Sequence, residues 1–377
     1  MKVLIVGGGP AGTLAAINLG NKCEVTLVEE HQAAGFPVQC AGLISQPCYD
    51  KLKKYSKRSL VNRIEGAFFF SPDGNYIEMV GKRKGVVIER KILDFELIKE
   101  ASRTAEIFLK STYVESCVES GSKKARIVTS SGERLEEYDL LIGADGVNSR
   151  VAREFGFSRP EIFSAVQVEL AFECLDENMV ELYFGRYYSD GFFAYAIPID
   201  SSTARLGVVS KSDPKSYLER LVEKHPSVSK RAGKSVIEVN AGAIPVGLNE
   251  IFKENVCLIG DSAGMVKPYT GGGIYYHLLA AEILGRNFPD LGKYRSDYLK
   301  LLGKDYRTGM RILRLYSKLS DTDYNELVRV GKDMFESYTK ELDMDHPSSL
   351  LSILPRLIKL VSLKPALIAK IAKELAL

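Results

Sequence analysis

The residues with the clearest chemical capacity lie within the first 30 positions. An apolar run, Val3–Val6, leads into Gly7, Gly9 and Gly12, which fit the pattern G-x-G-x-x-G, and Glu29 ends a second apolar run 17 residues later. In this pattern the glycines permit a tight turn, close approach of a pyrophosphate and close packing of a helix on a strand. The anion binds free N–H groups at the helix N-terminus, and the acid accepts from a ribose hydroxyl. The segment therefore predicts a dinucleotide site on a β-α-β unit.

Three later segments indicate which dinucleotide binds. Asp145 lies in a turn, GADG, that follows an apolar run, and Asp261 lies in a similar turn, GDSAG. The first of these turns can add pyrophosphate and ribose contacts. A carboxylate in the second can accept from ribityl hydroxyls, which FAD has and NAD lacks. Arg90, in RKILDFEL, is a cation that can reach the flavin phosphates or the ring edge. Together these segments predict FAD as the cofactor.

The composition narrows the class of protein. The 377 residues carry a net charge of +3, and their 45% hydrophobic and 26% charged residues are ordinary for a globular protein. No basic strip with interleaved aromatic residues is present, which argues against nucleic acid as a partner. The six cysteines have no C-x-x-C pair and no metal-ligand spacing with the four histidines, so no metal site is expected. With no signal peptide and no apolar run of about 18–20 residues, the sequence predicts a cytoplasmic protein.

The spacing of apolar residues predicts the elements that position these groups. Continuous apolar runs predict buried parallel strands at 3–6, 138–143 and 256–260. Period-two alternation predicts an antiparallel sheet with one covered face, over residues 166–172, 180–184, 193–197 and 206–208. Further strands are expected at 67–70, 76–80, 86–88, 113–118 and 125–129. Helices are expected at 92–105, 213–232, 271–284 and over most of the chain from 291.

These elements predict an α/β (α+β) fold with three parts. A Rossmann-like FAD-binding domain is expected to be discontinuous, over residues 1–65, 85–155 and 242–290. An inserted antiparallel-sheet substrate domain is expected over 66–84 and 156–241. Residues 291–377 are expected to form a helical C-terminal region.

The motifs resemble those of a known family. The segments GGGPAG, RKILDFEL, GADGVNS and GDSAG are similar to those of flavoproteins with the aromatic-hydroxylase fold. More specifically, FPVQCAG and the later KPYTGGGI resemble the geranylgeranyl reductases. Within that family the chain is most similar to the archaeal enzymes that saturate digeranylgeranylglycerophospholipids. One departure is GFFAYAIP, where relatives often carry Trp and this chain has Phe193 and Tyr195.

The resemblance implies a set of FAD contacts. They fall on Ala11, Glu29, Cys40, Ala41, Arg90, Val114, Asp261, Gly273 and Ile274. The N–H groups of Gly272 and Gly273, at a helix start, can face the flavin pyrimidine and stabilise negative charge there.

The resemblance also implies the chemistry, which is the reduction of a C=C bond. Such a reduction needs a hydride from reduced flavin N5 and a proton for the other carbon. Cys40 and Tyr269 are the candidate catalytic residues, although Tyr269 also fits a packing aromatic and Cys40 a small buried residue. His277 fits a packing role better than that of a base.

The implied substrate is a prenylated lipid with chains of roughly 20 carbons, each buried CH₂ contributing about 0.8 kcal/mol. Aromatic residues of the antiparallel sheet are candidates to line its tunnel, foremost Tyr183, Phe193 and Tyr195, and then Phe172, Phe184 and Phe192. The alternative for each of them is an ordinary sheet core.

The partners follow from the same resemblance. The electron donor is external, and ferredoxin and NAD(P)H both stay open because no second G-x-G-x-x-G is present. Residues 351–377 carry five basic residues against Glu374, with an apolar helical face. Such a basic amphipathic helix can contact the inner face of a membrane or dock on the protein itself.

Two alternative functions use the same fold. One is a flavin monooxygenase, and the other is a quinone-linked electron-transfer flavoprotein. The C-A-G element argues against the first, and the lack of a cysteine cluster argues against the second.

Overall fold

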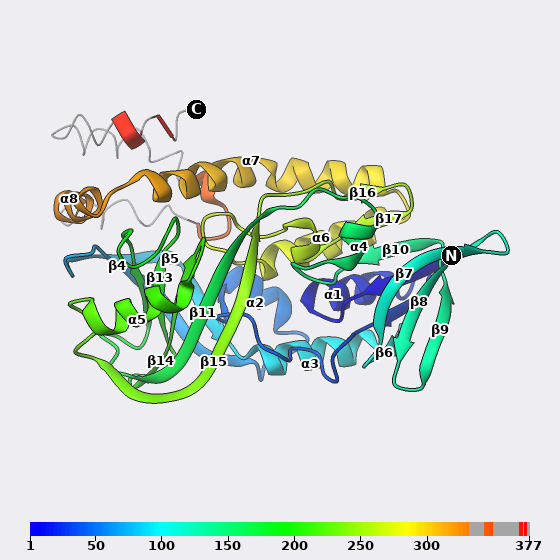
Figure 1. Ribbon diagram of the computed structural model, residues 1–377, viewed down its shortest axis with the longest axis horizontal. Helices are drawn as coiled ribbons and strands as arrows, with labels where there is room; N and C mark the ends of the chain where they lie inside the picture. Colours follow the sequence, from blue (N-terminus) through cyan, green and yellow to red (C-terminus); the bar gives the residue numbers. More distant parts are fainter. Residues whose placement is uncertain (332–342, 350–368, 372, 375–377) are drawn as a thin grey trace.

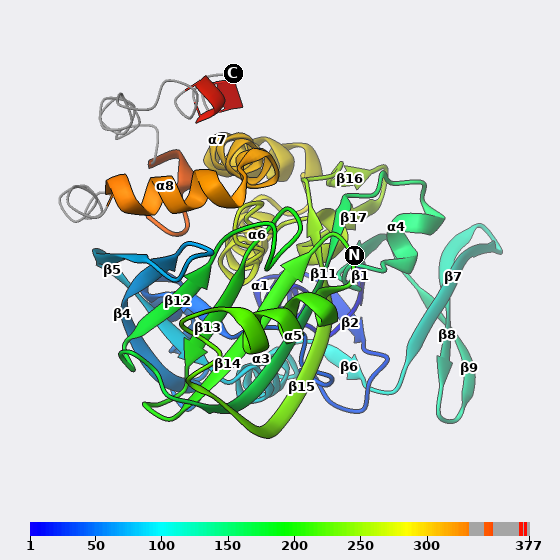
Figure 2. The same cartoon turned by 60° about the vertical axis from the view of Figure 1, so that its left-hand side comes forward.

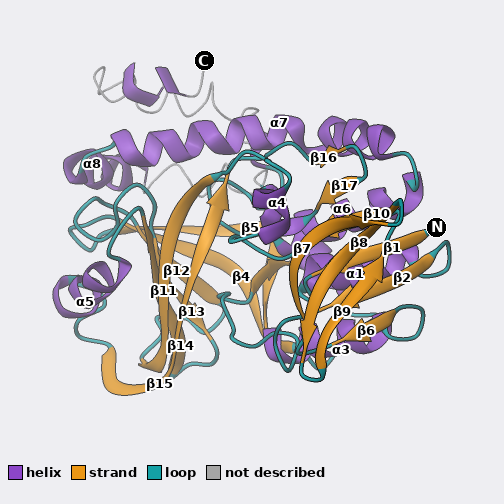
Figure 3. Ribbon diagram, turned by 45° about the vertical axis from the view of Figure 1, so that its right-hand side comes forward, coloured by secondary structure: helices purple, strands orange, loops and turns teal. Residues whose placement is uncertain are grey.

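A computed structural model describes residues 1–331, 343–349, 369–371 and 373–374. Two halves lie side by side, and the long helix α7 (Leu291–Lys318) runs past both of them (Figure 1). One half is built on a mostly parallel sheet and the other on a mostly antiparallel sheet (Figure 3). The predicted α/β (α+β) fold is confirmed.

The first half contains a six-stranded sheet with the order β16-β17-β10-β1-β2-β6, in which only the β16–β17 pair is antiparallel. Its strands are β1 (Lys2–Val6), β2 (Glu24–Val28), β6 (Glu106–Phe108), β10 (Leu140–Gly143), β16 (Phe252–Lys253) and β17 (Val256–Leu258). In register, Val6 pairs with Gly143, and Gly143 pairs with Leu258. The three glycine turns that follow β1, β10 and β17 therefore meet at one edge of the sheet.

The helices of this half start at well-defined signals. They are α1 (Pro10–Leu19), α2 (Gln46–Leu52), α3 (Arg90–Ala101), α4 (Arg150–Glu154) and α6 (Ile274–Asn287), with a short 3₁₀ helix, η1 (Gly260–Ala263). Pro10 occupies the first turn of α1, where its missing N–H leaves no helical bond unmade. Ser45, Glu89 and Ser149 accept backbone N–H groups at the starts of α2, α3 and α4.

A three-stranded antiparallel ribbon is attached to this half. Its strands are β7 (Thr112–Glu119), β8 (Ser122–Thr129) and β9 (Gly132–Glu137). Figure 2 shows the ribbon projecting away from the rest of the molecule. The strands predicted at 113–118 and 125–129 are thus confirmed.

The second half is an eight-stranded sheet with the order β15-β11-β14-β13-β12-β4-β5-β3. Its strands are β3 (Leu43–Ser45), β4 (Leu60–Phe70), β5 (Tyr76–Ile88), β11 (Glu161–Phe172), β12 (Met179–Tyr183), β13 (Ala194–Pro198), β14 (Thr203–Ser210) and β15 (Ala232–Val246). The prediction of a purely antiparallel sheet is wrong at one place, because β12 pairs with β4 in parallel. This pair joins the hairpin β4–β5 to the strands that come much later in the chain.

Both faces of this sheet are buried, so the prediction of one covered face is also wrong. On one face lies α5 (Pro214–Lys224) (Figure 2). Its Leu218 and Leu221 are buried in one cluster with residues of the strands. We call this the packed face, and the opposite one the cavity face. On the cavity face lie α7 and, beyond it, α8 (Asp321–Gly331) and the short helix η4 (Pro347–Ser349).

Several predicted boundaries need correction. The strand expected at 86–88 is the end of β5, the helix expected at 213–232 ends at Lys224, and the one expected from 271 begins at Ile274. The eight-stranded sheet includes β3, which lies inside the predicted FAD-binding range 1–65. The division into domains stays a prediction. Most of the predicted C-terminal amphipathic face lies outside the described residues.

Candidate active site

The turn after β1 is shaped by its missing side chains. Gly7 has a φ of +108°, and a Cβ there would run into the carbonyl of Ala144 in the neighbouring turn. A Cβ at Gly12 would run into the carbonyl of Gly7, so the third glycine lets α1 pack on the strand. At Gly9, by contrast, an added Cβ would meet no atom of the described residues within 4 Å. The middle glycine therefore faces open space, beside a helix N-terminus that no side chain caps.

This open space is a cavity of about 750 Å³, which we call the nucleotide cavity. It follows the sheet edge where the three glycine turns meet. The predicted cofactor residues that line it are Gly7, Gly9, Glu29, Arg90, Asp145 and Asp261. Other residues that line it are not among those predicted from the sequence, including His31, Phe36, Tyr113, Arg150 and Arg153.

Glu29 is fixed at the end of β2 by three donors. One carboxylate oxygen accepts from Gly8 N at 2.6 Å, and the other accepts from His31 N at 2.8 Å and contacts His31 Nδ1 at 2.6 Å. An ionised carboxylate offers about four acceptor positions, so one remains for a hydroxyl group. The buried acid is thus oriented toward the cavity as a hydrogen-bond acceptor.

Arg90 is a permanent cation in the wall of the same cavity. Its guanidinium donates two hydrogen bonds to Asp94, at 3.0 and 2.7 Å. Burial by itself would lower the pKa of Arg90, but the charge of Asp94 and the nearby Cys40 thiol outweigh it and raise that pKa. Arg90 therefore stays charged and can face the anionic or electron-rich part of a cofactor.

The two other predicted acids, Asp145 and Asp261, differ in how far hydrogen bonds within the protein already occupy their oxygens. Asp145 accepts from Ser149 Oγ at 2.6 Å and from the N–H groups of Arg150 and Val151, and so holds its own turn together. Burial raises the pKa of Asp145 despite these bonds. Asp261 is partly exposed to the cavity, with His277 Nε2 at 3.2 Å. Asp261 is therefore the better placed of the two to accept from a ligand hydroxyl.

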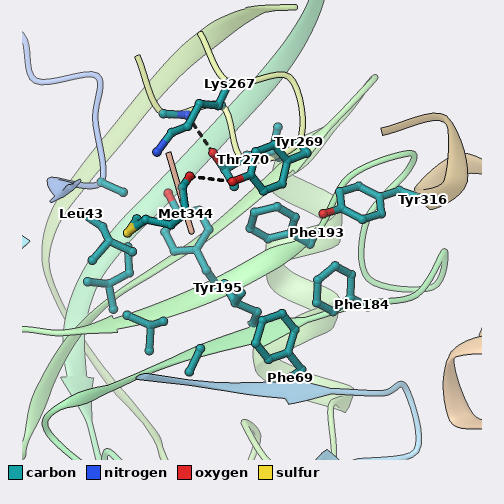
Figure 4. A pocket seen from close by; sticks show the side chains of 18 of the residues that line it. Leu43, Phe69, Phe184, Phe193, Tyr195, Lys267, Tyr269, Thr270, Tyr316 and Met344 are labelled. Carbon is teal, nitrogen blue, oxygen red and sulfur yellow. Dashed lines mark hydrogen bonds between the residues drawn. The ribbon is translucent and has the colours of Figure 1, made fainter. Parts of the chain in front are cut away.

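A second cavity, of about 630 Å³, lies between the cavity face of the eight-stranded sheet and α7. We call it the apolar cavity. Its aromatic wall is formed by Phe69, Phe184, Phe193, Tyr195 and Tyr316, whose side chains gather on one side in Figure 4. Two predicted substrate residues, Phe193 and Tyr195, thus lie in this wall. The Tyr195 ring lies against Gly207, where a Cβ would run into the ring.

The third predicted substrate residue, Tyr183, does not line the apolar cavity. It is fully buried in the packed face, where its hydroxyl donates to Glu181 beside Arg231. Adjacent residues in a strand point to opposite faces, so Leu182 and Phe184 border the cavity and Tyr183 cannot. Burial also raises the pKa of Tyr183 well above its usual value. The prediction for Tyr183 is corrected to a structural role.

The two cavities touch. Gln39 and residues 241–243 of β15 border both of them, and Cys40 and Ala41 border the apolar cavity next to Gln39. Gly271 and Gly272 lie in the wall of the apolar cavity, just before α6. The predicted Cys40 and the predicted glycine loop are therefore brought to the place where the two cavities meet.

Tyr269 lies in the wall of the apolar cavity, but its hydroxyl is already engaged. It donates to the carbonyl oxygen of Met344 at 2.6 Å (Figure 4). Burial raises the pKa of Tyr269 well above its usual value. The hydroxyl proton is thus held in a hydrogen bond that ties the loop to residues 343–349.

A buried ion pair in the same wall had no local signal in the sequence. Lys267 Nζ lies 2.9 Å from Asp345 Oδ1, and both side chains are almost fully buried. An added Cβ at Gly272 would lie 3.1 Å from Lys267 Cε, so the lysine packs directly on the glycine loop. His346 next to it contacts Asp305 of α7 at 2.9 Å. Residues 343–349 are therefore pinned to both the loop and α7.

The remaining predicted cofactor residues surround the cavities without lining them. Ala11, Gly12, Val114, Gly273 and Ile274 border neither cavity. Gly12 and Ala11 instead pack α1 against the turns, where a Cβ at Gly260 would run into Ala11. Gly273 is the N-cap of α6 and has no capping side chain, which leaves N–H groups of the first turn available.

Comparison with known proteins identifies a matching family model and similar relatives. The sequence model of the family described as lycopene cyclase protein matches residues 2–300. A digeranylgeranylglycerophospholipid reductase of Methanospirillum hungatei is 30% identical, over 86% of this chain and 88% of that one. An uncharacterized protein of Methanocaldococcus jannaschii is 29% identical, over 92% and 93%.

Solved structures show the same fold. A geranylgeranyl bacteriochlorophyll reductase-like protein of Thermoplasma acidophilum superposes with a TM-score of 0.81, at 23% identity, over 96% of this chain and 98% of that one. A p-nitrophenol 4-monooxygenase of Pseudomonas putida has a TM-score of 0.71, at 16% identity, over 94% and 97%. The chain belongs to the lycopene cyclase protein family and, as the resemblance of its motifs predicted, to the geranylgeranyl reductases.

Proposed function

We propose that the protein is an FAD-dependent reductase that saturates C=C bonds in the geranylgeranyl chains of a membrane-lipid precursor. The observation that carries this proposal is the contact between the nucleotide cavity and the apolar cavity at Gln39 and residues 241–243. This arrangement suits a flavin cofactor in one cavity and a long apolar chain in the other. The names of the relatives support a digeranylgeranylglycerophospholipid as the class of substrate.

The residues present fit FAD. The open space at Gly9 and the uncapped start of α1 suit a pyrophosphate. Glu29 suits a ribose hydroxyl, and Asp261 suits the ribityl chain. We propose that Arg90, beside Cys40, faces the flavin ring system. Asp261 borders the nucleotide cavity and is about one-third exposed, so beside its contact with His277 it can still accept from a ligand hydroxyl.

The protein residues have separate tasks in the proposed reaction. When bound, reduced FAD supplies a hydride from N5. The N–H groups at the start of α6 stabilise negative charge on the flavin pyrimidine, and the apolar wall excludes water from the reacting carbons. Because the Tyr269 proton is held by Met344, we propose that the Cys40 thiol at the junction delivers the proton to the second carbon.

The shape of the apolar cavity suits a prenyl chain. Its wall continues from the glycine loop to Tyr324, Leu327 and Val328 of α8. A chain of roughly 20 carbons gains about 0.8 kcal/mol for each buried CH₂ and needs few polar contacts. We propose that the chain lies along this wall with a double bond at the junction.

The partners belong to the same proposal. We propose an external electron donor, either ferredoxin or NAD(P)H, and action at the cytoplasmic side of a membrane that the lipid substrate occupies. None of the described helices is long and apolar enough to cross a bilayer. Lys370, one of the five basic residues in 351–377, lies 2.6 Å from Asp323 of α8. This contact favours docking on the protein for that residue.

An anaerobic reoxidation experiment tests the function. The purified protein is photoreduced, its FAD is identified by its spectrum, and digeranylgeranylglycerophospholipid is added. We expect the flavin to reoxidise while the lipid gains mass in steps of two hydrogens. The matched control is the fully saturated lipid, which should leave the flavin reduced.

Two outcomes would overturn the proposal. A flavin that stays reduced with the unsaturated lipid and reoxidises only with oxygen would indicate a monooxygenase. Reoxidation only with a quinone would indicate an electron-transfer flavoprotein. Comparing reduced ferredoxin with NADPH as the first reductant, under the same conditions, identifies the donor.

A further inference from the structure

Arg205 of β14 is a buried arginine at the back of the active-site wall, and the sequence analysis did not single it out. Its side chain is only 9% exposed. Nε donates to Glu169 Oε2 at 3.0 Å, directly across the strand pair β11–β14. Nη2 donates to Glu89 Oε2 at 2.9 Å. The remaining nitrogen, Nη1, reaches backbone rather than another carboxylate.

That backbone belongs to the segment that carries Cys40 and to the end of β5. Arg205 Nη1 donates to the carbonyl oxygens of Ala41 and Ile88, each at 3.2 Å. Ile88 N in turn donates to Gly42 O at 2.9 Å, and Gly42 N donates to Cys40 Sγ at 3.4 Å. The guanidinium thus closes a ring of bonds around the turn 40–42.

Gly42 makes room for this arrangement. Its φ is +80°, and an added Cβ would lie 2.6 Å from Arg205 Nη1 and would run into Ile88 O. The glycine of the C-A-G element is therefore required at this position both by its backbone conformation and by the arginine behind it. The turn 40–42 and Arg205 are thus complementary, although Ala41 and Arg205 are 164 residues apart in the sequence.

The same guanidinium also reaches the start of α3. Glu89, which accepts from Arg205, accepts through its other oxygen from Lys91 N at 3.0 Å and so caps the helix. Arg90 is the first residue of that helix and lines the nucleotide cavity. One side chain therefore holds both the thiol-bearing turn and the helix start that carries the cavity cation.

We propose that Arg205 is a positioning residue that sets Cys40 at the junction of the two cavities and Arg90 in the wall of the nucleotide cavity. It does so by bonding four acceptors on three chain segments, at residues 41, 88–89 and 169, with one planar fork. A lysine is a point charge on a flexible stem and cannot span these acceptors at once. The effect of Arg205 on catalysis rests on the proposed function. Its effect on the positions of Cys40 and Arg90 does not.

The molecule offers a matched control on the other face of the same sheet. Arg231 is 10% exposed and pairs with Glu181 at 2.6 Å. It also donates to the carbonyl oxygens of Glu173 and Ser227. Arg231 is thus as buried as Arg205 and similarly hydrogen-bonded, but its partners are Glu181, Glu173 and Ser227 and not the turn 40–42.

The test compares Arg205→Lys and Arg205→Gln with Arg231→Lys and Arg231→Gln, all as full-length purified proteins. Backbone hydrogen exchange is followed for peptides covering 40–44, 86–92 and 225–232, together with the visible absorption bands and the Kd of bound FAD. In both Arg205 variants we expect at least tenfold faster exchange at Gly42 and Ile88, a shifted flavin band and at least tenfold weaker FAD binding. In the Arg231 variants we expect faster exchange at 225–232 and an unchanged flavin band.

The possible results separate the hypotheses. Unchanged exchange at Gly42 and Ile88 in Arg205→Gln would overturn the proposal, and so would equal flavin changes in Arg231→Gln. If Arg205→Gln fails to fold, Arg205→Lys carries the comparison, because it keeps a positive charge beside Glu169. A wild-type protein that binds FAD but leaves the lipid unreduced would overturn the proposed reaction alone. The exchange results would then still decide the role of Arg205.

Discussion

The two faces of the eight-stranded sheet are made by alternate residues of the same strands, yet they serve different purposes. On the packed face Phe172 and Tyr183 are almost completely buried, in the cluster that includes Leu218 and Leu221 of α5. On the cavity face Phe184, Phe193 and Tyr195 border about 630 Å³ of space. Apolar composition therefore does not by itself distinguish a core from a ligand site. What differs is whether another element fills the space in front of the side chains.

The buried polar groups differ in the same way. On the packed face Arg231, Glu181 and Tyr183 bond one another and adjacent backbone. On the cavity face Arg205 bonds the turn beside the junction, and Lys267 packs on the glycine loop. Buried polar groups need partners wherever they lie. On the cavity face those partners are the segments that shape the active site.

The largest expected difference between the faces is in the response to truncation of an aromatic ring. Phe172→Ala on the packed face removes a ring that is 1% exposed and should lower the free energy of unfolding by about 3–5 kcal/mol. Phe193→Ala on the cavity face, 7% exposed, should cost only about 1–2 kcal/mol, because its ring already borders open space. Urea unfolding measures both. Equal losses would show that the cavity face is packed like a core.

The comparison also shows what the sequence could and could not predict. The nucleotide turn follows from three glycines within six positions, because Gly7 and Gly12 are required by local geometry and Gly9 leaves space open beside the helix start. Tyr183 and Phe184 were both expected in one tunnel, although adjacent strand residues must face opposite sides. Both faces of the eight-stranded sheet are buried, so no polar face marks the outside. The alternation of residues along the strands therefore does not tell the packed face from the cavity face.

Contacts over long separations left no local pattern. Lys267 and Asp345 are 78 positions apart, and Arg205 and Ala41 are 164 apart. Arg205 did carry one signal, since it is a charged residue inside the apolar run of β14. A buried charge in a strand indicates a specific partner, but only the fold shows which one.

The next largest effect concerns pH and the packed face. His225 is fully buried among Phe70, Tyr183 and Tyr188, and burial lowers the pKa of His225 to about 4. The unfolded chain binds a proton near pH 6.5, whereas the native protein resists it until about pH 4. The stability is therefore complete above pH 6.5 and falls by about 3 kcal/mol as the pH drops toward 4.

Unfolding at pH 7.5 and pH 4.5 checks this expectation. In His225→Gln the fall between the two pH values should be smaller by about 2–3 kcal/mol than in the wild type. His346→Gln is the control from the cavity side. Its hydrogen bond to Asp305 raises the pKa of His346, so its contribution is lost as the pH rises instead. An unchanged acid slope in His225→Gln would contradict the assignment to His225.

The smallest effect gives the sharpest test of the comparison, because it fills space instead of removing atoms. Ala196 on β13 lies in the packed face and is completely buried, and Ala67 on β4 lies in the wall of the apolar cavity. Ala196→Leu overfills a closed core and should cost about 1–3 kcal/mol of unfolding free energy. Ala67→Leu has room for the added carbons and should change stability by less than about 1 kcal/mol. The stability difference alone would establish which face is open.

The same pair then tests what the open face is for. The leucine at position 67 takes the place of about three ligand CH₂ groups, or about 2 kcal/mol of lost binding. The KM for the geranylgeranyl lipid should therefore rise roughly thirtyfold in Ala67→Leu and stay unchanged in Ala196→Leu. A lipid with shorter prenyl chains should recover most of the loss, because it leaves the far part of the cavity empty. If Ala67→Leu destabilises the protein as much as Ala196→Leu does, or leaves the KM unchanged, the two faces do not differ as the structure indicates.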